Sequence, residues 1–212
     1  MAQRTIHYLF REIISRQITL SDKKRFLLGS ILPDAIESSN RDISHFKVTT
    51  DTRKYFDFGA FRIKYYDQIL QDDLYLGYYM HLVEDAFYRV FFYNSRFPMP
   101  RIPEEVRILH QDYHILNAYI VQKYQIQNIL DVTFPLNDTP ILNLTSFLID
   151  EFLVELSHDF TEQIQGNTTF ITEQMLDQFI ERFIPLAIKE AESMKHGFSI
   201  LNTTDFTWLS KR

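Results

Sequence analysis

The stretch from Asp73 to Tyr93, DLYLGYYMHLVEDAFYRVFFY, constrains the fold most, because it is the most apolar and aromatic run in the chain and yet contains a histidine and an aspartate. Its apolar residues recur at helical spacing, and Asp72 or Asp73 can cap its start, so the sequence predicts a largely buried helix. His81 and Asp85 lie one turn apart on the same face of that helix. A buried imidazole and a buried carboxylate each need a partner, and a metal ion is one such partner.

The spacing of this pair has a second interpretation. A histidine that is hydrogen-bonded to a carboxylate four residues later produces the same HxxxD pattern on any helix. Gly77, one further turn back, leaves no side chain on that face. We interpret the gap as room for an ion or a substrate. The positions of the other histidines help to choose between a metal site and a simple hydrogen-bonded His–Asp pair.

Composition favours a single helical domain. The chain has 212 residues, with only five glycines and seven prolines, and this length is enough for one sizeable core. Residues 37–51 are polar and predict a loop. Helices are predicted over residues 5–16, 21–29, 56–70, 73–93, 103–124, 143–164 and 172–196. The predicted fold class is therefore all-α, with residues 1–212 forming a single compact multi-helix bundle of about seven helices.

Charge and cysteine usage exclude several classes of function. The formal net charge of −6 argues against a general nucleic-acid-binding surface, which would be basic. The chain has no cysteine, so any metal site must be built from His, Asp and Glu. No apolar run reaches about 18 residues, so no transmembrane segment is predicted. The first twenty residues are amphipathic and do not resemble a signal peptide, so we expect a cytoplasmic protein; its oligomeric state is not indicated.

Candidate ligands occur in several of the predicted elements. His7 lies in the first turn of the first helix, Asp34 follows Pro33 in a turn, and His45 stands in the polar loop. Each has an ordinary structural explanation as a first-turn residue, a turn former or a loop hydrogen-bonding residue. The predicted helix over residues 103–124 adds a further set with a four-residue histidine spacing, which we treat as secondary metal or substrate candidates: His110, Asp112 and His114.

The order of these motifs resembles one known superfamily. The motifs are His7, the run GSILPDA with Asp34, His45 before Phe46, and GYYMHLVEDAF with His81 and Asp85. They are similar in order and rough spacing to the zinc-dependent phospholipase C and S1/P1 nuclease superfamily, whose members are all-helical hydrolases of phosphate esters. The resemblance covers about the first half of the chain. It implies a phospholipase C/P1 nuclease-like fold.

The resemblance also implies a role for each residue. His7 would hold one zinc ion, and Asp85 would bridge it to a second ion. The second ion would be held by Asp34, His45 and His81. Asp34 would also orient or deprotonate a metal-bound water, whose pKa a divalent ion lowers from about 16 towards about 7. Members of the superfamily carry further His and acidic ligands after HxxxD, but this chain has phenylalanines nearby, so one or two ions are expected instead of three.

The predicted function is a zinc-dependent hydrolase acting on a small phosphate ester, either a phosphodiester or a phosphomonoester. An HD-type phosphohydrolase is disfavoured, because adjacent His and Asp occur only at His158 and Asp159, on a polar face. The alternative is a non-catalytic helical protein that keeps the family fold and uses the same pocket to bind a ligand or a protein. In that case His81 and Asp85 would simply pair with each other.

Overall fold

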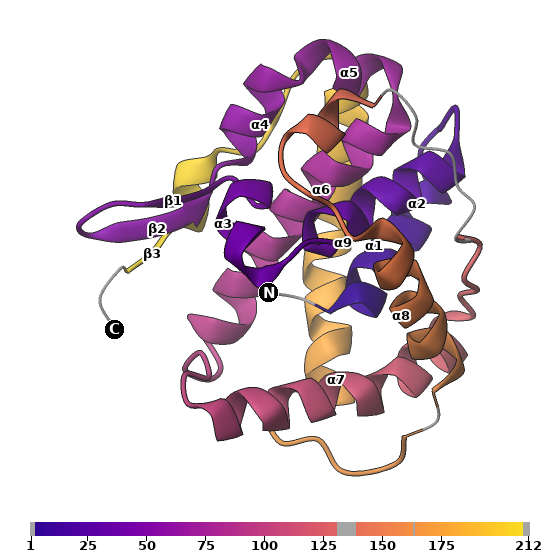
Figure 1. The fold of residues 1–212 in the computed structure, drawn as a ribbon, viewed down its shortest axis with the longest axis vertical. Helices are drawn as coiled ribbons and strands as arrows, with labels where there is room; N and C mark the ends of the chain where they lie inside the picture. The colour runs from indigo at the N-terminus through magenta and orange to yellow at the C-terminus, as the bar shows by residue number, and fades with distance from the viewer. Residues whose placement is uncertain (1–2, 131–138, 163, 210–212) are drawn as a thin grey trace.

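The helix α6 (Asp73–Tyr88) lies at the centre of the fold, as its apolar sequence predicts, and all 16 of its residues are buried (Figure 1). The computed structural model describes residues 3–130, 139–162 and 164–209. Within these ranges the chain is mostly helical, with nine α-helices and a small sheet. Besides α6, the α-helices are α1 (Arg4–Ser15), α2 (Lys23–Ile31), α3 (Arg41–Ser44), α4 (Phe58–Lys64), α5 (Tyr66–Gln71), α7 (Pro103–Tyr124), α8 (Ile149–Thr161) and α9 (Glu173–Lys195).

The sheet was not predicted. It is antiparallel, in the order β1 (Lys47–Thr49), β2 (Arg53–Phe56) and β3 (Trp208–Leu209), and it extends to one side of the helices in Figure 1. The turn between β1 and β2 is fixed by Thr50, whose N–H donates to the Arg53 carbonyl at 2.8 Å. β3 pairs with β2 through Lys54 and Trp208. A two-residue strand contributed by the end of the chain has no local sequence signal, because its only partner is 150 residues away.

One loop prediction and one helix prediction also need correction. The predicted loop over residues 37–51 contains α3 and β1. The single helix predicted over residues 56–70 is divided at Tyr65 into α4 and α5. α4 begins later than predicted, because the side chain of Asp57 accepts a hydrogen bond from the N–H of Ala60 and caps the helix there.

Two glycines let α2 and α6 cross with their backbones in contact. A Cβ at Gly77 would lie 2.1 Å from the backbone oxygen of Phe26, and a Cβ at Gly29 would lie 2.0 Å from that of Leu74. Gly77 therefore makes room for a helix, and our interpretation of it as room for an ion or a substrate is wrong. The close crossing brings the end of α2 against the middle of α6.

Gly77→Ala is expected to destabilise the protein by about 1–3 kcal/mol, because the added methyl forces the two helices apart. Alanine is the better helix former by about 1 kcal/mol, so a net loss would come from the crossing itself. Urea denaturation measures the change. Gly166→Ala is the control, since its Cβ would meet only the side chain of Ile115, at 3.1 Å. Equal stability of the two variants would contradict this account.

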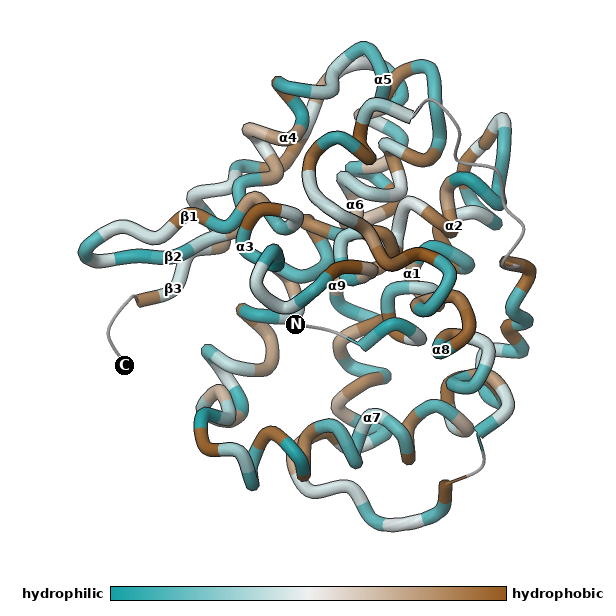
Figure 2. Tube along the Cα trace, viewed as in Figure 1, coloured by the Kyte–Doolittle hydropathy of each residue, from teal (hydrophilic) through white to brown (hydrophobic). Residues whose placement is uncertain are grey.

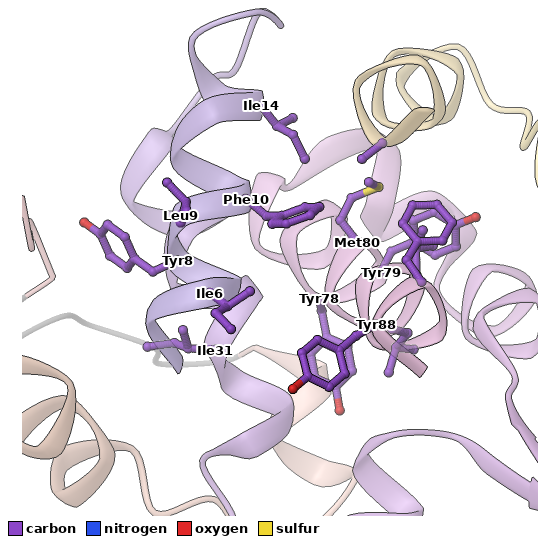
Figure 3. Close-up of a cluster of buried hydrophobic side chains, with 14 of the residues drawn as sticks. Ile6, Tyr8, Leu9, Phe10, Ile14, Ile31, Tyr78, Tyr79, Met80 and Tyr88 are labelled. Atoms are coloured by element: carbon purple, nitrogen blue, oxygen red, sulfur yellow. The ribbon is translucent and has the colours of Figure 1, made fainter. Parts of the chain in front are cut away.

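α1 packs against α6 through its apolar face. Figure 3 shows Phe10 of α1 directed toward α6 near Met80, whereas Tyr8 points to the opposite side of α1. The Tyr8 hydroxyl donates to the carbonyl of Gln127 at 2.8 Å and accepts from the N–H of Ile129 at 3.0 Å. Both faces of α1 are thus buried, and polar residues on this helix need partners inside the protein.

The outer helices are amphipathic. Figure 2 shows hydrophilic and hydrophobic residues mixed along α7 and α8, and these helices bury only six of 22 and three of 13 residues. Among the described residues, no helix is both long enough and apolar enough to cross a membrane.

Candidate metal centre

The structure brings all five predicted ligands together in one buried cluster. His7 comes from α1, Asp34 from a 3₁₀ turn directly after α2, and His45 from the residue that ends α3. His81 and Asp85 come from the middle of α6. The three histidines and Asp85 are fully buried, and the side chain of Asp34 is only 6% exposed. Residues that are scattered over the first half of the chain therefore form a single site.

Hydrogen bonds fix the segment that carries Asp34 and His45. Pro33 favours the tight turn after α2, and its carbonyl accepts a hydrogen bond from the Ser44 hydroxyl at 2.8 Å. The Ser44 carbonyl in turn accepts from the hydroxyl of Tyr78 on α6 at 2.6 Å. Ser44 is thus hydrogen-bonded both to the turn after α2 and to the central helix α6. These two bonds position His45, the next residue.

Each histidine directs Nδ1 outward to an acceptor. His81 Nδ1 lies 2.6 Å from the Ser30 carbonyl oxygen, and His45 Nδ1 lies 2.9 Å from that of Arg41. His7 Nδ1 lies 3.1 Å from a carboxylate oxygen of Glu84. The carbonyl partners hold the proton on Nδ1 of His81 and His45 and leave their Nε2 lone pairs for a metal ion, whereas His7 Nδ1 faces the carboxylate without a hydrogen bond among the described residues. All three Nε2 atoms face the centre of the cluster.

Two of these nitrogens meet in a way that calls for a cation. His45 Nε2 and His81 Nε2 are 3.2 Å apart. A carbonyl oxygen can only accept, which assigns the proton of each neutral ring to Nδ1, so neither Nε2 can donate to the other unless one ring takes up a second proton. Two buried lone pairs at this distance repel unless a positive charge lies between them. The simple pairing of His81 with Asp85 is not seen, since His81 Nε2 is 3.9 Å from Asp85 Oδ2.

The two aspartates stand between His7 and His45 and offer a different oxygen to each. Asp85 Oδ1 lies 3.6 Å from His7 Nε2, and Asp85 Oδ2 lies 3.5 Å from His45 Nε2. Asp34 Oδ2 lies 3.8 Å from His7 Nε2, and Asp34 Oδ1 lies 3.3 Å from His45 Nε2. The resemblance implied a bridging role for Asp85 alone, but both carboxylates have this placement.

The spacing of the ligand atoms suits a tetrahedral metal site. Zinc binds nitrogen and oxygen ligands at about 2.0–2.2 Å, which puts neighbouring ligand atoms roughly 3.3–3.6 Å apart. The separations around His45 fall at or close to that range. His45, His81 and Asp85 place one ligand atom each within 4.8 Å of one another, and so do His7, Asp34 and His81. The donor set therefore fits one or two divalent ions.

The electrostatic surroundings shift the pKa values of three of the five ligands. Burial acts to raise the pKa of Asp34, but the positive charge of Arg41 is the largest of the opposing effects, which together hold it well below its usual range. Burial, with His7 and His45 nearby, lowers the pKa of His81. Burial also acts to lower the pKa of His7, but Glu84 and the two aspartates outweigh it and raise that pKa. The lowered pKa values keep Asp34 ionised and His81 neutral, which are the forms that bind a metal ion, whereas His7, whose pKa is raised, must give up its proton to bind one.

Sequence reasoning missed the residues that support the histidines from outside. Glu84 and Arg11 are both buried, and Arg11 donates to the Glu84 carboxylate and, at 3.0 Å, to the Met80 carbonyl. The only local signal was spacing: Arg11 lies one turn after His7, and Glu84 one residue before Asp85. A charged residue on an otherwise apolar helix face can be recognised, but its partner on another helix cannot.

Three of the five ligands, Asp34, His45 and Asp85, line a cavity of about 720 Å³. His110 and His114 of α7 also line this cavity, and this location fits the secondary role predicted for them. His114 Nδ1 is paired with Glu162 at 2.7 Å. These residues lie along the cavity wall and stay candidates for substrate contact.

The third secondary candidate has other contacts. The Asp112 carboxylate accepts hydrogen bonds from three consecutive backbone N–H groups, those of Thr169, Phe170 and Ile171, at 2.8, 2.5 and 3.0 Å. Asp112 thus anchors the segment before α9. Within the described part of the chain, these hydrogen bonds join Asp112 to residues 169–171 and not to the five ligands.

Comparisons with protein-family models, with curated proteins and with solved structures find no match. The function is therefore argued from the geometry and chemistry of the site.

Proposed function

We propose that the protein is a metal-dependent hydrolase of phosphate esters. Its site would hold one or two divalent ions, and we propose zinc because imidazole and carboxylate ligands in a tetrahedral arrangement suit that ion. One observation carries the proposal. The Nε2 atoms of His45 and His81 face each other at 3.2 Å beside two carboxylates, and His45 and both carboxylates line a large cavity. A closed structural site would not open onto a cavity, whereas a catalytic site must.

The chain supplies ligands, orientation and access. When bound, the ion acts as a Lewis acid that makes water acidic enough to attack a phosphate ester at neutral pH. Asp34 is held ionised beside Arg41, at 2.6 Å, which suits a residue that binds the ion and orients the attacking water. Asp34 and His45 both line the cavity, so a substrate that enters it reaches them.

We further propose the phospholipase C/P1 nuclease-like fold and a cytoplasmic location. The first is supported by the mostly helical framework and by the meeting of His7, Asp34, His45, His81 and Asp85 in one site. The cytoplasmic location stays a prediction from the sequence.

Elemental analysis of the purified protein, without an affinity tag, tests the proposal. One or two equivalents of zinc, manganese or iron are expected in the wild type, and His81→Ala should lose them because it removes one of the facing Nε2 atoms. A screen of phosphomonoesters and phosphodiesters then tests hydrolysis. If the wild type takes up no metal after incubation with zinc at neutral pH, the hydrolase proposal fails and a non-catalytic binding protein is favoured.

A further inference from the structure

Arg89 follows the two metal ligands of α6 along the same helix face. Residues 81, 85 and 89 are spaced by four, so the arginine lies one turn beyond Asp85. The predicted helix over residues 73–93 changes here, because Arg89–Tyr93 form a π-helical turn. Such turns are rare and often occur at functional sites. Arg89 also lines the same cavity as Asp34, His45 and Asp85.

Among the described residues the Arg89 guanidinium has no ion-pair partner, in contrast to three other cations of the cavity wall, Arg4, Arg41 and Lys47. Arg4 lies 2.7 Å from Asp159, and Lys47 lies 2.7 Å from Asp42. No carboxylate of the described residues is within ion-pair distance of Arg89, and its buried Nε has no hydrogen-bond partner among them. Its Nη1 donates only to a weak acceptor, the Met99 sulfur, at 2.7 Å.

Aromatic rings hold the guanidinium in place. Its carbon lies 4.5 Å from the centre of the Trp208 ring and 5.0 Å from that of Tyr93. Stacking of this kind orients the planar group without neutralising it. Trp208 belongs to β3, so the pairing of β3 with β2 places this ring at the cavity wall. A preoriented arginine fork without a direct ion pair is a suitable receptor for a phosphate group, which it can bind with two hydrogen bonds.

We propose that Arg89 binds the phosphate of the substrate, and that the apolar wall beside it receives an apolar or aromatic organic group of the same ester. Phe56, Trp208 and Met99 line this part of the cavity. The inference rests on the proposed function, because it names the substrate class of the same site. Arg89 is a binding and positioning residue here: it holds the phosphate toward the ligands that precede it on α6.

Trp208 provides a direct readout, because it is the only tryptophan in the chain and it lies against Arg89. Tryptophan fluorescence is titrated with phenyl phosphate, and with inorganic phosphate as a second probe, on zinc-free and on zinc-loaded protein. Calorimetric titration of the same samples gives an affinity that does not depend on the fluorophore. We expect a saturable change in both forms and tighter binding of phenyl phosphate, whose ring adds apolar contact.

Three variants isolate the arginine. Arg89→Met keeps an unbranched side chain against Trp208 but removes the charge and the donors, and should weaken binding at least about tenfold. Arg89→Lys keeps the charge without the planar fork and should lose less. Arg53→Met is the matched control, since this substitution removes the same charge from an exposed position on β2, the strand that pairs with β3. Circular dichroism and thermal melting show whether each variant is folded.

The outcomes separate this inference from the proposed function. Loss of binding in Arg89→Met with unchanged zinc content, and normal binding in Arg53→Met, supports Arg89 as the phosphate site. If zinc binds but the wild type shows no saturable response, or if folded Arg89→Met responds like the wild type, the inference is overturned while the metal centre stands. If no zinc binds but the response depends on Arg89, the anion site stands and the hydrolase proposal fails.

Discussion

Asp85→Asn is expected to remove most of the bound metal and most of the hydrolase activity while the fold remains intact. The carboxylate offers one oxygen to the His7 side of the site and the other to the His45 side, at 3.6 and 3.5 Å from the two Nε2 atoms. Asparagine has the same shape but no charge, and it carries one donor where the ion needs two acceptors. Replacement of an outer partner alone typically lowers metal affinity about 10–100-fold, so loss of a direct ligand should exceed that.

The stability of the metal-free variant should not fall. The asparagine amide can donate to one of the facing histidine nitrogens, and one buried negative charge is removed. Urea denaturation without metal, together with zinc equivalents and phosphate-ester turnover with metal, measures these effects separately. A variant that loses zinc only because it unfolds would be recognised by its denaturation midpoint.

His158→Ala is the control, because His158 is exposed on α8 and lies outside the site. We expect zinc content, turnover and stability to match the wild type. Equal zinc retention in Asp85→Asn and His158→Ala would show that the site is not built around Asp85.

The part of the fold that the sequence predicts well is the part set by local periodicity. The apolar pattern of residues 73–88 predicted the buried central helix, and the HxxxD spacing placed His81 and Asp85 on one face of it. The order of His7, Asp34 and His45 pointed to the same site, although their meeting depends on how four segments pack. Spacing constrains which residues can share a face, and tertiary packing decides which faces meet.

The errors share a physical cause. Gly77 was interpreted as room for a ligand, but a missing side chain on one helix equally permits contact with another helix. Arg89 appeared as one more residue of a helix, because its ring partner Trp208 is more than 100 residues away in the chain. A contact between distant segments leaves no periodic signal in either of them, so the residues that support and extend the site could not be found from sequence.

The buried charges of Arg11 and Glu84 beside His7 affect both the stability of the fold and the binding of metal. Glu84 accepts from the fully buried Arg11 and faces His7 Nδ1 at 3.1 Å. It therefore compensates one buried charge and also fixes the ring orientation of a metal ligand. Loss of its negative charge should affect both properties, through different partners.

Glu84→Gln is expected to destabilise the metal-free protein by about 3–5 kcal/mol, because it leaves the Arg11 guanidinium buried without a counter-charge. Metal affinity should fall by about 10–100-fold, since His7 loses its charged outer partner. Urea denaturation in the absence of metal measures the first effect. Zinc competition with a chromogenic chelator, at urea concentrations where both proteins are folded, measures the second.

Glu155→Gln makes the same chemical change at an exposed ion pair, that with Arg4, where the Glu155 side chain is 60% exposed. It should cost less than about 1 kcal/mol and leave zinc affinity unchanged. The double variant Arg11→Met with Glu84→Leu removes both buried charges, and it should recover most of the stability but not the zinc affinity. If Glu84→Gln is as stable as Glu155→Gln, Arg11 does not depend on this carboxylate. If the double variant binds zinc like the wild type, His7 does not need its outer partner.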